Sequence, residues 1–182
     1  MAVTVLWPLR DIYLIISAKP ESRLRSNIEI LKDRRLPGYQ RQDIIMIGIV
    51  IVTHSRLGAA FIEASELIIG NKPEATVSVS IDLNENVDKL REKIASGIKK
   101  VNRKEGVLIL TDMFGGTPSN LSYSFLEEGH IEVISGVNLP ILIKAINTRK
   151  KMELGKLAAT LESFGKKSIS LASGILKGNK RS

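Results

Sequence analysis

From residue 46 onward the chain alternates continuous apolar runs with stretches whose apolar residues recur every three or four positions. Residues 47–53 form an unbroken run rich in β-branched side chains, which predicts a buried strand covered on both faces. The next segment has helical spacing and ends at Gly70, a residue type typical of a helix C-terminus. Its apolar positions are Leu57, Ala60, Phe61, Ala64, Leu67 and Ile68.

The alternation of predicted strands and helices continues to about residue 172. Further strands are expected at residues 75–81, 107–111 and 131–135, with a short one at 168–172. Further helices are expected at residues 87–98, 118–128, from 140 onward, and over 152–164. Asn86 can cap the first of these, while Gly129 and Gly165 are expected to end the second and the last. The pattern predicts an α/β fold: a doubly wound, mostly parallel sheet with helices on both faces.

The same pattern divides the chain into three parts. Residues 46–172 form the predicted domain. Residues 1–45 hold two short apolar pieces and a polar, basic stretch, so we expect an extension of unassigned role or a start codon placed too far upstream. Residues 173–182 form a basic tail, which is typical of a solvated terminus.

Composition narrows the possible chemistry. The 182-residue chain is 43% hydrophobic, which suits one globular domain with a real core. It contains no Cys and only two His, His54 and His130, so thiolate zinc sites, iron–sulfur clusters, cysteine nucleophiles and multi-histidine metal sites are excluded. Any histidine chemistry therefore falls on one of two residues, and no metal site is expected.

Charge and hydropathy bear on partners and location. The net charge of +8 divides into +3 over residues 1–45, −2 over 46–148 and +7 over 149–182, so the central domain gives little support for nucleic-acid binding. No apolar run reaches the roughly eighteen residues that a membrane-spanning helix needs. Polar and helix-breaking residues such as Pro8 and Arg10 interrupt the N-terminal apolar stretch, which argues against a signal peptide. We expect a cytoplasmic protein.

Two polar residues stand where ligands bind in parallel sheets, just beyond the carboxyl ends of strands. His54 follows the first predicted strand and Asp112 follows the third. If these strands are neighbours, the two side chains meet at one edge. A carboxylate that accepts a proton from one imidazole nitrogen fixes the tautomer and leaves the other nitrogen free to attack, an arrangement suited to phosphoryl acceptance.

The flanking residues could bind the phosphate. Backbone N–H groups in the turn from Ser55 to Gly58, with the Arg56 guanidinium, are suitable donors at a predicted helix N-terminus. A second set of donors lies in the glycine-rich turn Gly115-Gly116, with the hydroxyl of Thr117.

Structural explanations compete with each of these functional ones. Gly115 and Gly116 can serve an irregular turn, Thr117 can cap a helix and Pro118 can open it. Arg56 can be a solvated residue of a first helical turn. The second histidine, His130, precedes a strand and is expected at the opposite edge of the sheet, in a structural role.

Three blocks carry a family resemblance. They are residues 47–58, IGIVIVTHSRLG; residues 110–120, LTDMFGGTPSN; and residues 132–140, EVISGVNLP. Their order and content resemble the mannose-family enzyme IIA (EIIA-Man) of the bacterial phosphoenolpyruvate-dependent sugar phosphotransferase system. The resemblance covers residues 46 to about 172, while residues 1–45 have no counterpart in the family's IIA domain.

The resemblance implies both an activity and partners. It implies that His54 accepts a phosphoryl group from the phosphocarrier HPr and passes it to a histidine of a IIB component, supported by Asp112, with Thr117 near the phosphate. It implies a cytosolic homodimer that exchanges a C-terminal strand, here residues 168–172. No metal or organic cofactor is implied, and a membrane enters only indirectly, through a permease complex.

Other functions remain open at this point. One is a regulatory phosphocarrier with the same chemistry but no cognate permease. Another is the phosphoryl donor domain for dihydroxyacetone kinase, which has a similar strand-Thr/Ser-His-Ser start, although the loop 115–118 argues against it. A nucleotide-binding or interaction module without chemistry is disfavoured, because the chain lacks both a GxxxxGK[ST] loop and a GxGxxG motif after a strand.

Overall fold

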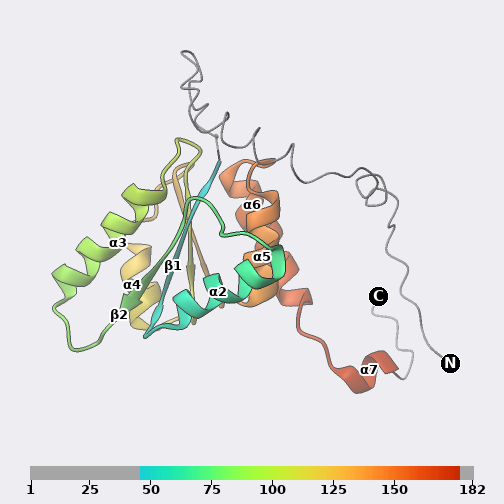
Figure 1. Ribbon diagram of the computed structural model, residues 1–182. Coiled ribbons are helices and arrows are strands. Elements are labelled where there is room, and N and C mark those ends of the chain that lie inside the picture. The colour runs from blue at the N-terminus through green and yellow to red at the C-terminus, as the bar shows by residue number, and fades with distance from the viewer. Residues whose placement is uncertain (1–45, 177–182) are drawn as a thin grey trace, which may run out of the picture. The chain divides into compact units, whose positions relative to one another are not determined.

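The computed structural model describes residues 46–176. The expectations for residues 1–45 and for most of the basic tail lie outside these residues. Within them, four strands form one sheet in the order β2-β1-β3-β4, and every neighbouring pair is parallel (Figure 1). The strands are β1 (Gly48–His54), β2 (Thr76–Ile81), β3 (Val107–Thr111) and β4 (Ile131–Ser135). The predicted parallel sheet is confirmed.

Helices cover both faces of the sheet, as predicted (Figure 1). They are α2 (Leu57–Ile69), α3 (Val87–Val101), α4 (Thr117–Tyr123), α5 (Leu139–Thr148) and α6 (Leu154–Lys167). A short helix, α7 (Ala172–Leu176), follows α6 and takes no part in either core. On one face Ile49 and Ile51 of β1 pack in a core with residues of α2, α5 and α6. On the other face Val50 and Val52 pack with residues of α3 and α4. Each apolar strand residue thus meets a helix on its own side, which explains the unbroken apolar run of β1.

Several helix ends were predicted from local signals, and two are confirmed. Gly70 caps α2 in the left-handed conformation with φ 83°, and the Asn86 side chain accepts a hydrogen bond from the backbone N–H of Asp88 at the start of α3. Two are wrong: α4 ends at Tyr123 rather than at Glu128, and α6 runs past Gly165 to Lys167.

The predicted strand at 168–172 is absent from the single chain. Residues 168–171 belong to no strand, and α7 begins at Ala172. Among residues 46–176 the sheet consists of β1 to β4, and residues 168–171 add no further strand to it. The exchange of this segment between two chains stays a prediction.

A buried arginine joins elements at the end of the sheet where the strands begin. Arg149, just after α5, donates through Nη1 to the carbonyl oxygens of Ile47 and Ala75 at 3.4 and 3.2 Å and to Thr76 Oγ1 at 3.2 Å. Its Nη2 donates to the carbonyl oxygen of Glu74. Burial lowers the pKa of the guanidinium, and the Glu74 carboxylate opposes that effect. The arginine thus ties α5 to the start of both β1 and β2.

Among residues 46–176, every helix is too short or too polar to cross a bilayer.

Candidate active site

His54 is the last residue of β1, and the turn that follows is held tightly. The hydroxyl of Thr53, fully buried, accepts a hydrogen bond from the backbone N–H of Gly58 at 2.8 Å, so α2 begins close behind the strand end. Between them Ser55 has a left-handed backbone with φ 50°. This turn leaves the His54 side chain at the surface with 36% of its area exposed.

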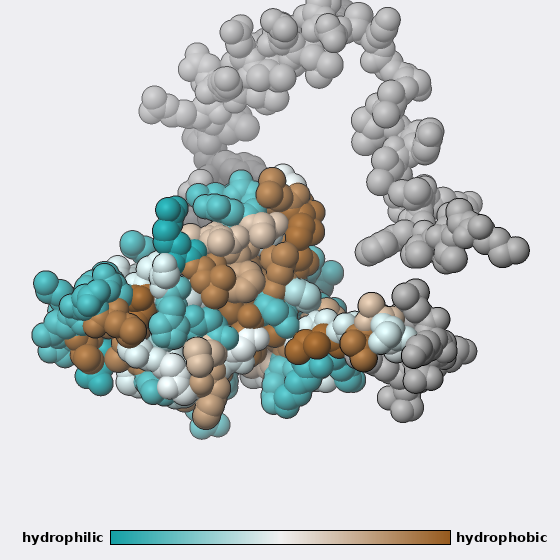
Figure 2. Space-filling view, turned by 90° about the horizontal axis from the view of Figure 1, so that it is seen from below, coloured by the Kyte–Doolittle hydropathy of each residue, from teal (hydrophilic) through white to brown (hydrophobic). Residues whose placement is uncertain are grey.

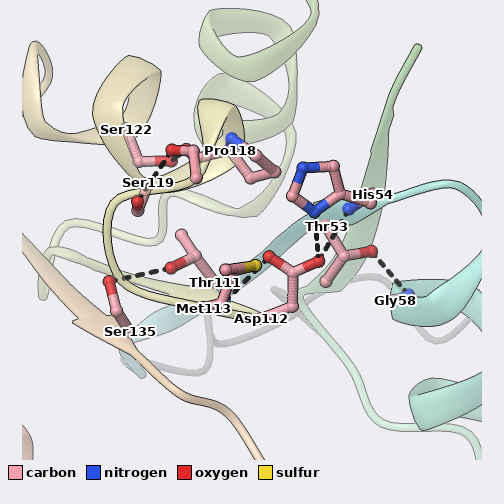
Figure 3. A network of polar contacts seen from close by, with 11 residues as sticks. Thr53, His54, Gly58, Thr111, Asp112, Met113, Pro118, Ser119, Ser122 and Ser135 are labelled. Atoms are coloured by element: carbon pink, nitrogen blue, oxygen red, sulfur yellow. Dashed lines mark hydrogen bonds and ion pairs between the residues drawn. The ribbon is translucent and has the colours of Figure 1, made fainter. Parts of the chain in front are cut away.

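His54 meets Asp112 at the edge where the strands end (Figure 3). Because β1 and β3 are neighbours, two residues that are 58 positions apart lie side by side: Nδ1 of His54 is 2.8 Å from Oδ2 of Asp112. A carboxylate can only accept at this distance, so the hydrogen bond places the proton on Nδ1. The lone pair of the neutral ring is then on Nε2. The predicted pairing of these two side chains is confirmed.

The Asp112 carboxylate is held by backbone groups as well. Its Oδ2 also accepts from the backbone N–H of His54 at 2.9 Å, and its Oδ1 accepts from the backbone N–H of Met113 at 2.9 Å. Partial burial raises the pKa of Asp112, but the hydrogen bonds and the charge interaction with His54 outweigh it, so the net pKa lies below its ordinary value. Asp112 is therefore an ionised acceptor with a fixed orientation at neutral pH.

The loop from Asp112 to α4 lies against the histidine ring. Gly115 has φ 78°, a left-handed conformation that favours glycine. Gly116 has ordinary backbone angles, but a Cβ placed on it would lie 3.1 Å from Cε1 of His54. Gly116 therefore serves a close approach to the imidazole, while Gly115 serves the turn.

The remaining predicted residues are near the pair in sequence or on the same loop, but their side chains make no hydrogen bond to it. Ser55 and Arg56 are exposed at the start of α2, and Thr117 is partly buried as the first residue of α4. Thr117 is not the cap of that helix, because Gly116 occupies the N-cap position. Within residues 46–176 no hydrogen bond is made by the side chains of Ser55, Arg56 or Thr117. Their phosphate-binding roles stay predictions.

His130 lies at the other end of the sheet, as expected. It immediately precedes β4, its side chain is 72% exposed, and its Nδ1 is 3.7 Å from a carboxylate oxygen of Glu127. It therefore takes no part in the His54 site. In the described part of the chain, no cluster of three or more His, Asp or Glu side chains could hold a metal ion.

Sequence reasoning missed a set of hydroxyl residues beneath the site. Thr111, directly before Asp112, donates from Oγ1 to Ser135 Oγ at 2.9 Å, and Tyr123 bonds to the same Ser135 oxygen at 2.9 Å. Two of these residues are the last of their strands, a position that parallel-sheet reasoning associates with ligand sites. That signal was available, but only the strand order reveals that β3 and β4 are neighbours.

Exposed apolar residues lie on the segments that follow β1, β2 and β3, at the edge of the sheet that carries His54. Figure 2 views the molecule from below Figure 1, toward the end of the sheet where the strand arrows finish, and apolar and polar residues are intermixed on that face. Phe114, with 79% of its area exposed, and Met113 extend from the loop after β3, while Leu57 and Leu83 follow β1 and β2. Exposed apolar residues beside a reactive group are typical of a surface that contacts another protein.

Comparison with known proteins identifies the family. Residues 48–162 match the family model EIIA-man, described as the PTS system fructose IIA component. The chain is 32% identical over 129 residues to the fructose-specific EIIA component of the phosphotransferase system (PTS) of Bacillus subtilis strain 168, a match covering 70% of this chain and 88% of that protein. It is 34% identical over 104 residues to the mannose-specific EIIAB component of Escherichia coli strain K12, covering 57% of this chain and 32% of that longer protein.

Solved structures agree with this assignment. The fold matches the crystal structure of the phosphotransferase system component EIIA from Streptococcus agalactiae with a TM-score of 0.63 and 27% identity, over 70% of this chain and 98% of that one. The family match spans all four strands and the His54–Asp112 pair. The chain therefore belongs to the EIIA-man family and has the role of a phosphocarrier component of a sugar phosphotransferase system.

Proposed function

We propose that His54 is the residue that carries the phosphoryl group, and that Nε2 is the nitrogen that receives it. The observation that carries the proposal is the 2.8 Å hydrogen bond between Nδ1 of His54 and Oδ2 of Asp112. It directs the proton to Nδ1 and the lone pair to Nε2, on a ring that is 36% exposed. In this scheme the donor is phosphorylated HPr and the acceptor is a histidine of a IIB component.

The transfer needs few chemical groups. The Nε2 lone pair attacks the phosphorus of the donor's phosphohistidine, a new N–P bond forms, and the donor's N–P bond breaks with its electron pair returning to the donor ring. The phosphorylated His54 ring keeps its Nδ1 proton and gains positive character, which the ionised Asp112 stabilises. Transfer to the IIB histidine repeats the same step. Exchange between two histidines is nearly isoenergetic, so alignment and water exclusion account for most of the catalysis.

The phosphate-binding groups are proposed from their positions. Ser55 and Arg56 follow His54 on one side, and Gly115, Gly116 and Thr117 form the loop on the other. Backbone N–H groups of both turns, the Thr117 hydroxyl and the Arg56 guanidinium are suitable donors to phosphate oxygens. The exposed apolar residues around His54 then serve as the docking surface that HPr and the IIB component occupy in turn.

The arrangement of the whole chain is also a proposal. Residues 46–172 act as the phosphocarrier domain, with residues 1–45 as an extension and 173–182 as a tail. Two chains form a cytoplasmic homodimer in which residues 168–172 are exchanged. β4 is an end strand of the sheet within residues 46–176, and beyond the bridge between Ile131 and Glu127 its outer edge is one place for an exchanged strand to pair.

Phosphorylation by the upstream components tests the site assignment. The wild-type chain is incubated with phosphoenolpyruvate, enzyme I and HPr, and its intact mass and acid lability are measured. One acid-labile phosphoryl group is expected in the wild type and in His130→Ala, and none in His54→Ala with an unchanged circular dichroism spectrum. Phosphorylation of His54→Ala, or its loss in His130→Ala alone, would overturn the assignment.

Two further measurements test the finer parts of the proposal. Long-range ¹H–¹⁵N NMR of the phosphorylated chain identifies the modified nitrogen, and modification of Nδ1 would contradict the role given to Asp112. Addition of a IIB protein should remove the phosphoryl group from the chain. A phosphorylated chain that releases its group to no IIB component would favour the regulatory phosphocarrier instead.

A further inference from the structure

Three hydrogen bonds join Thr111, the residue directly before Asp112, to the end of β4 and the turn after it. Thr111 is the last residue of β3 and is fully buried. Its carbonyl oxygen accepts hydrogen bonds from the backbone N–H groups of Gly136 and Val137, each at 2.9 Å. Its hydroxyl donates to Ser135 Oγ at 2.9 Å (Figure 3). The end of β4 and the turn after it therefore fix the backbone from which Asp112 projects.

The Ser135 hydroxyl also binds the far end of the active-site loop. Tyr123 is the last residue of α4, and its hydroxyl lies 2.9 Å from Ser135 Oγ. The chain leaves β3 at Thr111, passes through Asp112 and Gly116, and returns along α4 to Tyr123. Because Thr111 and Tyr123 both hydrogen-bond to Ser135 Oγ, Ser135 joins the two ends of this stretch of chain.

The exposed tip of the active-site loop, at Phe114, packs against Tyr123. The rings of Phe114 and Tyr123 lie with centroids 6.3 Å apart at a tilt of 48°. Tyr123 thus contacts the tip of the loop through its ring, and its hydroxyl bonds to the Ser135 oxygen that also binds Thr111 at the base of the loop. The loop that carries Asp112 and contacts the His54 ring is restrained at both places.

From these contacts we infer that Ser135, with Thr111 and Tyr123, is a positioning residue for phosphoryl transfer. This inference rests on the proposed role of His54. The three hydroxyls hold the backbone at Asp112, and Asp112 holds the imidazole through Nδ1 and the backbone N–H of residue 54. Loss of the Ser135 hydroxyl leaves the pairing of β3 with β4 and the two backbone hydrogen bonds to the Thr111 carbonyl in place, so the fold persists. The two ends of the loop, at Thr111 and Tyr123, are then no longer joined through Ser135. The carboxylate then samples orientations in which Nε2 is misaligned.

The decisive comparison is Ser135→Ala against Ser135→Thr. Threonine keeps the hydroxyl and suits a strand, whereas alanine removes only the oxygen. The measurement is the single-turnover rate of phosphoryl transfer from phosphorylated HPr at increasing HPr concentration. We expect Ser135→Ala to lower the rate at saturation about tenfold with an unchanged half-saturating concentration. Ser135→Thr should transfer within about twofold of the wild type, and Tyr123→Phe should slow transfer in the same way as Ser135→Ala.

A matched hydroxyl at the other end of the sheet separates positioning from stability. Thr76 is the buried first residue of β2, and its hydroxyl donates to the carbonyl oxygen of Glu74 at 2.9 Å. Thr76→Val should lower the melting temperature and leave the transfer rate unchanged. Equal slowing by Thr76→Val, or a saturated rate of Ser135→Ala within twofold of the wild type, would overturn the inference. If His54→Ala still accepts phosphate, the proposed function fails instead, so the two failures are distinguishable.

A spectroscopic readout checks the geometry directly. The ¹⁵N shifts of the unphosphorylated His54 ring report which nitrogen carries the proton. Wild type and Ser135→Thr should give one tautomer, protonated at Nδ1, and Ser135→Ala should shift toward a mixture. A pure Nδ1 tautomer in Ser135→Ala would show that Asp112 is held without the Ser135 hydroxyl, and would count against the inference.

Discussion

Replacing Gly116 by alanine tests how closely the His54 ring must be held. The backbone of Gly116 has φ −78° and ψ 165°, angles that alanine adopts freely. A Cβ at this position would lie 3.1 Å from Cε1 of His54 and 3.2 Å from Cγ of Met113. Met113 is an exposed, flexible side chain that can move aside. The substitution therefore acts on the imidazole rather than on the chain conformation.

The size of the effect follows from the contact distance. Carbon atoms in good contact are about 3.5–4.0 Å apart, so the ring must withdraw by roughly 0.4–0.9 Å from a contact of 3.1 Å. Cε1 lies between Nδ1 and Nε2, so this movement strains the bond to Asp112 and displaces the proposed nucleophile. A misplacement of about 1 Å can slow a reaction about 100-fold, which puts the expected loss near tenfold. The free energy of unfolding should change by less than about 1 kcal/mol.

The neighbouring glycine provides the control. A Cβ on Gly115 meets no atom within 4 Å, but its φ of 78° is unfavourable for alanine. Gly115→Ala should therefore destabilise the protein by about 1–2 kcal/mol while slowing transfer less than Gly116→Ala does. Both variants are assayed by the rate of phosphorylation from HPr and by urea unfolding. A wild-type rate for Gly116→Ala would refute the steric argument, and an equal loss in both variants would assign the effect to the loop's conformation.

Two further predictions concern stability. Arg149→Ala should lower the free energy of unfolding by about 2–4 kcal/mol, because it removes a buried side chain and its hydrogen bonds to Ile47, Thr76 and Glu74; urea unfolding within 1 kcal/mol of the wild type would contradict this role. Because folding lowers the pKa of Asp112, its ionised carboxylate stabilises the fold at pH values above the ordinary pKa of 3.8. This contribution is lost as the pH falls through the lower pKa of the folded state. The stability difference between the wild type and Asp112→Asn should therefore narrow below about pH 4, and a difference that persists there would show that the ionised carboxylate is not its source.

Local signals predicted most elements because those elements depend on local chemistry. The apolar runs that become β1 and β3 are buried on both faces, so their sequence alone distinguishes them from amphipathic helices. Gly70 and Asn86 were recognised because a left-handed cap and a side-chain cap need particular residue types. The two caps therefore follow from residue type, whereas β1 and β3 also need neighbouring strands with which to pair.

The wrong helix ends have tertiary or competing causes. The sequence predicts that Gly165 ends the helix, but this glycine is buried inside α6, where a side chain would collide with Ile141 of α5. Gly165 thus permits close packing of the two helices. The hydroxyl of Ser122 in α4 bonds to the carbonyl oxygen of Pro118, and that of Ser124, directly after the helix, bonds to the carbonyl oxygen of Leu121. Serines that bond to the backbone in this way compete with the helix, which helps to explain its early end at Tyr123.

The site itself depends on a property that no short motif contains, the register between two strands. Val52 pairs with Thr111, so His54 and Asp112 lie just beyond the last pair of the β1–β3 ladder. A slip of one residue would turn the Asp112 side chain toward the opposite face of the sheet and away from the imidazole. The residues that prevent a slip are the buried apolar ones behind the pair, which fit their own helices only in this register. The chemistry at His54 therefore depends on core packing as well as on the polar residues around it.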